Sequence, residues 1–283
     1  MAEGKKKYRF CFIPAFKTPS NMKQLEESGK KGGNVNLEKL APLLEDVEYD
    51  VHAGALASYG DWAVENREEA CLAAAARVKI VREVCESGKY NGLILSGGIE
   101  PGHFEAREIA RKFSIPVTSC AWAQFHVATM LGNKFSIISK AESSNMILYN
   151  IVVQHELTQR LASIRNINIP NVRPPYITEL TLRDERVKAE KGEPSEAVDR
   201  AVKACEAAIE EDGAEVMTFG CSALYWLQPF LQQRMDDMGW EIPVLDAYAC
   251  TITLLKAMVD MGVDASGLMF PADRPKKWRR KKV

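Results

Sequence analysis

This chain has little of the charge imbalance that marks nucleic-acid-binding proteins, and it lacks the long apolar runs that mark membrane proteins. Its formal net charge is −1, from 37 Lys and Arg against 38 Asp and Glu, so no overall field attracts a nucleic acid or an anionic membrane. No run approaches the roughly 20 apolar residues that cross a bilayer. The basic run Arg274–Lys282 indicates a solvated terminus. We expect a small-molecule substrate and neither nucleic acid nor membrane as partner, while a homo-oligomer stays open.

Disulfide and metal-site spacings are also missing. The seven cysteines form no CxxC motif and no cluster with histidines, which argues against a disulfide framework or a zinc site. A glycine-rich dinucleotide fingerprint and a P-loop lysine are absent too, so we expect no metal and no cofactor. Met1–Lys7 leads directly into the apolar run Tyr8–Pro14, which is too short for a secretory signal. We therefore expect a reducing, cytoplasmic location.

Strand-like apolar runs alternate with amphipathic helical stretches along the whole chain. The predicted strands are Tyr8–Ile13, Val47–Ala53, Gly92–Ser96, Pro116–Thr118, Lys134–Ser139, Ile167–Ile169, Val216–Phe219 and Val244–Asp246. The predicted helices are Glu65–Ser87, Glu105–Phe113, Ala121–Leu131, Ser144–Gln154, Gln159–Ser163, Ser195–Asp212, Tyr225–Met238 and Thr251–Asp260, with Ile177–Glu190 as a loop or short helix. This alternation predicts an α/β fold with mostly parallel sheets flanked by helices.

An internal repeat divides the chain into two halves. In the first copy Gly92–Gly98 precedes a helix and the strand Ser114–Thr118; in the second, Ala214–Cys221 precedes a helix and the strand Glu241–Leu245. The repeat predicts two pseudo-symmetric α/β lobes, with residues 1–119 in the first and 120–246 in the second. We expect residues 247–283 to add a C-terminal helix that returns to the first lobe, followed by the basic tail.

The two copies differ at the loop where function is expected. Ligand sites of parallel sheets collect at the carboxyl ends of the strands, and both repeat loops lie there. One loop offers the thiol of Cys221, whereas the other offers Gly97 and Gly98. We therefore expect the two loops to face each other across a cleft between the lobes, with a reactive group on one side alone.

Cys221 is the predicted catalytic residue. It follows a buried strand and opens a helix, whose N-terminus favours thiolate over thiol, and such a thiol can exchange a proton with carbon. The carbanion formed would need hydrogen-bond donors, which the backbone N–H groups of Gly97, Gly98 and Ser222 could supply. The loop after the strand Lys134–Ile138 adds further candidate substrate contacts, namely Ser139, Lys140, Ser143 and Ser144. Cys120 and the other cysteines are interpreted as core residues.

Several segments, in this order, resemble the aspartate/glutamate/hydantoin racemase superfamily, nearest its hydantoin and allantoin racemase branch. They are Ile13–Met22, Gly54–Tyr59, Glu100-Pro-Gly102, Leu161-Ala-Ser-Ile-Arg165, Gly213–Val216 and Gly220-Cys-Ser222. The resemblance implies a carbon-acid enzyme with its site between two lobes. It also implies that Thr18, Ser20 and Asn21 lie where the family's first loop binds a carboxylate or imide.

The resemblance departs from the family at one catalytic position. Such racemases use two cysteines on opposite faces of the substrate carbon, and only the second is matched, by Cys221. Counting back from Glu100 places Gly97 at the first position, whereas the internal repeat favours Gly98. A glycine there with one retained cysteine is similar to arylmalonate decarboxylase of the same superfamily.

These observations favour a cofactor-independent decarboxylase or isomerase that acts on a small carboxylate or imide-like substrate through Cys221. A first alternative is a hydantoin, allantoin or amino-acid racemase with His103 or a bound water as the second base. A second alternative is a catalytically inactive ligand-binding protein built on the same scaffold.

Overall fold

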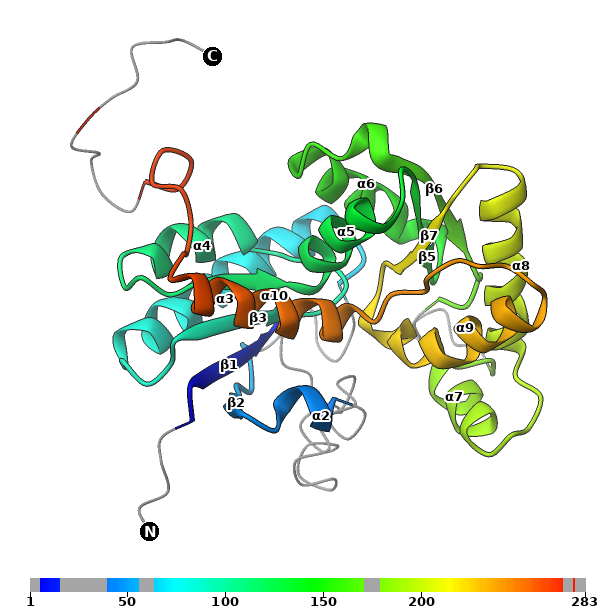
Figure 1. Cartoon of the computed structure of the whole chain (residues 1–283), viewed down its shortest axis with the longest axis horizontal. Helices are drawn as coiled ribbons and strands as arrows, with labels where there is room; N and C mark the ends of the chain where they lie inside the picture. Colours follow the sequence, from blue (N-terminus) through cyan, green and yellow to red (C-terminus); the bar gives the residue numbers. More distant parts are fainter. Residues whose placement is uncertain (1–5, 16–39, 56–63, 171–178, 272–276, 278–283) are drawn as a thin grey trace.

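The computed structural model describes residues 6–15, 40–55, 64–170, 179–271 and 277. Within these ranges the strands form two separate parallel sheets, each covered by helices. Figure 1 shows the first sheet with α3 and α4 toward one end of the long axis, and the second sheet with α8 and α9 toward the other. The predicted α/β fold with parallel sheets in two lobes is confirmed. Of the described helices, none is long and apolar enough to cross a bilayer.

The first sheet has the strand order β2-β1-β3-β4. Its strands are β1 (Tyr8–Pro14), β2 (Val47–Val51), β3 (Gly92–Ser96) and β4 (Val117–Ser119). β3 is buried at every residue, as expected for a mostly apolar strand in the centre of a parallel sheet. The helices of this half are α2 (Ala41–Leu44), α3 (Arg67–Glu86) and α4 (His103–Arg111). Asn66 caps α3 by accepting a hydrogen bond from the Glu69 N–H.

The second sheet repeats this order with one strand reduced to a single bridge. It runs β6-β5-β7, from β5 (Phe135–Ser139), β6 (Leu161–Asn166) and β7 (Val216–Phe219), and Val244 adds a parallel bridge to Met217. The predicted closing strand Val244–Asp246 is therefore only this bridge. The matching orders make β3 and β7 equivalent, with the loops at Gly98 and Cys221 directly after them.

The sequence prediction was wrong around β6. Gln159–Ser163 was expected to be helical and Ile167–Ile169 to be a strand, whereas a 3-10 turn at Thr158–Arg160 leads into β6. β6 is an edge strand whose six residues are all half-buried, so it lacks the apolar run that marks a central strand. Beyond it, Ile167 and Ile169 still donate backbone hydrogen bonds, to the carbonyls of Ser139 and Lys140.

The remaining helices begin after β4 and alternate with the strands of the second sheet. They are α5 (Cys120–Leu131), α6 (Asn145–Gln154), α7 (Leu182–Glu190), α8 (Glu196–Glu210), α9 (Gln228–Asp237) and α10 (Ala247–Met261), with 3-10 turns at Glu142–Ser144 and Ser222–Leu227. α8 is capped by Ser195, whose side chain accepts from the Val198 N–H. The predicted helix Tyr225–Met238 is thus a 3-10 turn followed by α9.

Two helices connect the halves. α10 packs on β3, β4 and α5, so the C-terminal helix lies against the first sheet, as Figure 1 shows for the orange helix. α5 packs against β7, where the Gln124 side chain both donates to the Phe219 carbonyl and accepts from the Phe219 N–H, at 2.7 and 2.9 Å. Gln124 thereby fixes the end of β7 just before Cys221.

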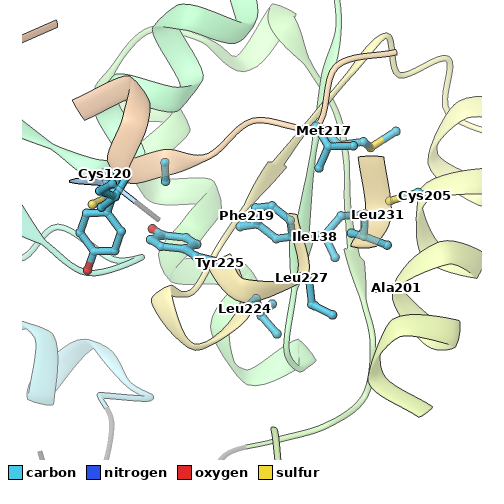
Figure 2. Close-up of a cluster of buried hydrophobic side chains, with 14 of the residues drawn as sticks. Cys120, Ile138, Ala201, Cys205, Met217, Phe219, Leu224, Tyr225, Leu227 and Leu231 are labelled. Carbon is cyan, nitrogen blue, oxygen red and sulfur yellow. The ribbon is translucent and has the colours of Figure 1, made fainter. Parts of the chain in front are cut away.

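One hydrophobic cluster covers the second sheet and extends to the first. Figure 2 shows Phe219 in this cluster, among Ile138, Leu224, Tyr225 and Leu227. Phe219 is fully buried and occupies the last position of β7. Its packing therefore sets the place from which the Cys221 loop departs.

Replacing Phe219 by alanine is expected to lower the free energy of unfolding by about 3–5 kcal/mol, the usual cost of removing a fully buried aromatic ring. Urea denaturation measures this loss. Phe113→Ala is the matched control, because Phe113 is 39% exposed and its removal should cost under about 1 kcal/mol. Equal losses in the two variants would contradict the assignment of Phe219 to the core.

Candidate active site

The loops that follow β3 and β7 meet backbone to backbone. An ideal Cβ built on Gly98 would lie 2.3 Å from the Cys221 Cα, 2.5 Å from the Gly220 carbonyl oxygen and 2.6 Å from the Cys221 nitrogen. No side chain fits into that space, so glycine at position 98 permits the close approach of the two halves. The two loops lie together as the repeat predicted, but at Gly98 and Cys221 they are in direct contact and not on opposite sides of a cleft.

Gly97 differs from Gly98 in both conformation and space. Its φ of +128° lies where L side chains are strained, but an added Cβ would meet only the Ile99 carbonyl oxygen at 3.3 Å and the Ala15 Cβ at 3.8 Å. Its carbonyl accepts a hydrogen bond from the Tyr225 hydroxyl at 3.4 Å. Tyr225 follows Cys221 in the 3-10 turn, so this bond also joins the two loops.

Arg77 holds the loop after β3 in place through hydrogen bonds. This buried guanidinium on α3 donates to the carbonyls of Ile13 and Ser96, each at 2.6 Å, and to that of Pro101 at 3.2 Å. Burial lowers the pKa of Arg77 to about 10, so it remains charged at neutral pH. The carboxyl ends of β1 and β3 and the start of α4 are therefore tied to one cation.

Cys221 is distinguished from most other thiols of the chain by its access to solvent. It is partly exposed, and Cys71 is exposed, whereas the other five cysteines are buried. Burial raises the pKa of Cys11, Cys85, Cys120, Cys205 and Cys250 to about 12. Cys120 thus lies in the core, as interpreted from the sequence, whereas the same interpretation was wrong for Cys71, which is exposed. The segment that Cys221 opens is the 3-10 turn Ser222–Leu227 rather than the expected α-helix.

The other predicted contacts fall in different surroundings. Ser139 ends β5 with a buried hydroxyl that has no hydrogen-bond partner among the described residues. Lys140 is buried, with its Nζ 3.6 Å from Glu65 Oε1, and Ser222 is partly exposed beside Cys221. Ser143, in contrast, is exposed. Thr18, Ser20 and Asn21 lie outside the described residues.

His103 belongs to a buried polar cluster that sequence analysis missed. Its ring lies next to those of Trp122 and His155, with centroids 6.0 and 5.7 Å away. Glu100 joins the cluster: its Oε1 contacts His155 Nε2, and its Oε2 accepts from the Ser119 hydroxyl and from the Trp122 N–H. In the sequence, Glu100 was noted only as part of the Glu100-Pro-Gly102 segment. The spacing of His103 and His155 along the chain gave no indication that the two histidines lie together.

The protonation of this cluster follows from its burial and its contacts. Burial opposes ionisation of Glu100, but its electrostatic interaction with His103 and the hydrogen bonds from His155 and Ser119 lower the pKa of its carboxyl to about 2. Burial lowers the pKa of His103 to about 3. At neutral pH Glu100 is therefore a carboxylate and His103 a neutral imidazole, which can accept a proton only weakly.

A pocket of about 450 Å³ opens beside this cluster. It lies between the start of α3, the loop Ile99–Gly102, the start of α4 and one face of α6. Glu100 and His103 line it, together with the polar side chains Arg67, Asn150 and Gln154. Its size is ordinary for a small-molecule site.

Two parallel sheets of matching strand order, with strand-end loops that meet at a partly exposed thiol, define an α/β protein of two similar halves. A family model described as Asp/Glu/Hydantoin racemase matches residues 44–255. The chain therefore belongs to this family of racemases and isomerases, and the resemblance seen in the sequence is confirmed.

Curated relatives agree with this assignment over part of their length. The chain is 28% identical over 167 residues to a hydantoin racemase of Paenarthrobacter aurescens, covering 59% of this chain and 61% of the relative. It is 26% identical over 167 residues to a hydantoin racemase of Rhizobium meliloti, covering 59% of each chain. The matches thus span about three-fifths of these relatives.

Solved structures share the fold over nearly the whole chain. An allantoin racemase from Klebsiella pneumoniae superposes with a TM-score of 0.67 at 21% identity, covering 95% of each chain. An arylmalonate decarboxylase superposes with a TM-score of 0.55 at 14% identity, covering 94% of this chain and 100% of that one. At these identities the similarity establishes the fold alone.

Proposed function

We propose that this protein is a carbon-acid enzyme in which Cys221 transfers a proton to or from one face of a substrate carbon. The observation that carries the proposal is the pairing of two loops. One presents the partly exposed thiol of Cys221, and the other, in direct contact with it, consists of Gly97 and Gly98 and presents no thiol.

Charge stabilisation would come from groups around these loops. Removal of a proton or of CO₂ from carbon leaves negative charge on the neighbouring oxygens, which preorganised hydrogen-bond donors stabilise. The N–H groups of Gly97, Gly98 and Ser222 are candidate donors, since they belong to the loops that meet. The buried hydroxyl of Ser139, free of partners among the described residues, and the buried ammonium of Lys140 would add a donor and a cation for a carboxylate or imide.

The type of reaction depends on whether a proton is transferred at one face of the substrate carbon or at both. One thiol suits decarboxylation or isomerisation, in which a single face is protonated. The names of the hydantoin racemase relatives favour racemisation, which needs a second base opposite Cys221. His103 is a candidate, but its pKa of about 3 makes it a poor base at neutral pH, so we favour the one-sided reaction.

Incubation of the protein with candidate carbon acids in D₂O tests the proposal. Substituted hydantoins, allantoin, aspartate, glutamate and arylmalonates cover the substrate classes, and NMR with chiral separation follows the label. We expect deuterium at one face of the carbon, in a product of single handedness. Deuterium in both enantiomers would establish the racemase alternative, with His103→Ala as the next variant. Binding of these compounds without any exchange would support a ligand-binding protein.

A further inference from the structure

We propose that Glu100, His103 and His155 form a binding site for a divalent transition-metal ion such as Zn²⁺. This site lies outside the thiol chemistry of Cys221 and does not depend on it. It would revise the expectation of no metal that the cysteine and histidine spacing gave.

The three side chains converge from separate parts of the chain. One ligand atom of each, a carboxylate oxygen of Glu100 and a ring nitrogen of each histidine, lies within 4.8 Å of the other two. Ligands around tetrahedral zinc stand about 3.3 Å apart, given bonds of roughly 2.0–2.1 Å. Small side-chain rotations would therefore bring all three onto one ion. Two imidazoles and one carboxylate are a common donor set for zinc and for ferrous iron.

Within the described part of the chain, the ring nitrogens of His103 lack the hydrogen-bond partner that buried polar atoms usually have. The residue is 1% exposed, and neither Nδ1 nor Nε2 has a hydrogen-bond partner among the residues that the structure describes. Buried polar side-chain atoms nearly always have a partner, which can be a residue, a water or an ion. A ring nitrogen of His103 that is buried and has no partner among the described residues is therefore positioned to bind an ion.

Glu100 is held in a position suited to such a ligand. Its Oε2 already accepts from the Ser119 hydroxyl and the Trp122 N–H, while Oε1 points to His155 Nε2. Such hydrogen bonds to the carboxylate orient a metal ligand. Arg77 and Arg107 lie near enough to affect His103, and their charge opposes a cation. The one carboxylate must offset that repulsion, so binding should depend most strongly on Glu100.

The location indicates what the ion would do. Glu100 and His103 belong to the β3–α4 segment of the first half, whereas His155 directly follows α6, which lies after β5 of the second half. The ion would cross-link the halves close to the Gly97–Gly98 loop. Glu100 and His103 also line the 450 Å³ pocket, and three protein ligands leave a coordination position for a water or a ligand oxygen.

Cobalt titration of the metal-stripped full-length protein tests the site directly. Co²⁺ substitutes for zinc and has visible absorption bands that depend on its ligands. We expect binding of one equivalent with bands typical of nitrogen and oxygen ligands, competition by Zn²⁺, and a rise in the thermal midpoint on adding Zn²⁺. A thiolate-to-cobalt charge-transfer band would place the ion on cysteine and overturn the proposal, as would the absence of stoichiometric binding.

Variants then assign the ligands. Glu100→Gln, His103→Asn and His155→Asn should each weaken cobalt affinity at least tenfold and remove the thermal shift by Zn²⁺. His52→Asn is the matched control, because His52 lies outside the cluster and its Nδ1 accepts from the Gly54 N–H. Cys71, an exposed cysteine, also lines the 450 Å³ pocket, so Cys71→Ser is a second control and should leave cobalt binding unchanged. Unchanged cobalt binding in folded Glu100→Gln, or lost binding in either control, would refute the assignment of the ligands. If a variant fails to fold, the cobalt spectrum of the unmodified protein decides whether the ligands are nitrogen and oxygen atoms.

Discussion

Replacing Cys221 by serine is expected to lower the rate of proton exchange at the substrate carbon by roughly 10³-fold, within the range usual for a lost acid–base group. Serine keeps the size of the side chain, but its hydroxyl is a far weaker acid than a thiol. Because Cys221 is partly exposed and serine is of similar size, the free energy of unfolding should change by less than about 1 kcal/mol. NMR-detected exchange in D₂O and urea denaturation measure the two effects.

Cys71→Ser is the control for this experiment, since Cys71 is the other thiol of the chain that is not buried. It should retain full exchange activity. Iodoacetamide adds an independent measurement: Cys221 should be alkylated while Cys120, whose pKa burial raises to about 12, stays unmodified in the folded protein. Full activity in Cys221→Ser would remove the thiol from the mechanism whatever the reaction proves to be.

Gly98→Ala is expected to lower the free energy of unfolding by about 3 kcal/mol or more, at the upper end of overpacking costs. The added methyl group would fall within 2.3–2.6 Å of Gly220 and Cys221 backbone atoms. Backbone cannot turn aside as the end of a flexible side chain can, so the two loops must separate. Proton exchange should fall with stability, since the same shift moves Cys221 away from the first loop.

Gly97→Ala is the natural control, since the neighbouring position has space but an unfavourable φ of +128°. The strain should cost about 1–3 kcal/mol, without moving Cys221. If Gly98→Ala proved the milder of the two, the close approach of the loops would be contradicted. Thermal and urea unfolding of both variants give the comparison.

The same geometry selects the position at which a second thiol can be introduced. Gly97→Cys should fold, whereas Gly98→Cys should not. The internal repeat identifies Gly98 as the residue equivalent to Cys221, but only Gly97 has space for a cysteine side chain. In the folded variant a planar carbanion could be protonated from either face. Deuterium should then enter both enantiomers, where the native protein labels one.

The sequence by itself determined the parts of the fold that depend on local patterns. Gly92–Ser96 and Val216–Phe219 were predicted with the bounds they have, because short, mostly apolar runs belong to central strands of parallel sheets. The order of elements also implied two similar halves. The edge strand β6 was missed, because its half-buried residues show no apolar pattern and its conformation comes from pairing with β5.

Only the tertiary structure decided how the site is assembled. The sequence singled out Cys221 and the two glycines, but contact between Gly98 and Cys221 depends on how one half docks on the other. It could not reveal Glu100, His103 and His155 as a cluster, because their spacing along the chain matches no metal-ligand pattern. Their side chains converge only where the β3–α4 loop meets the end of α6.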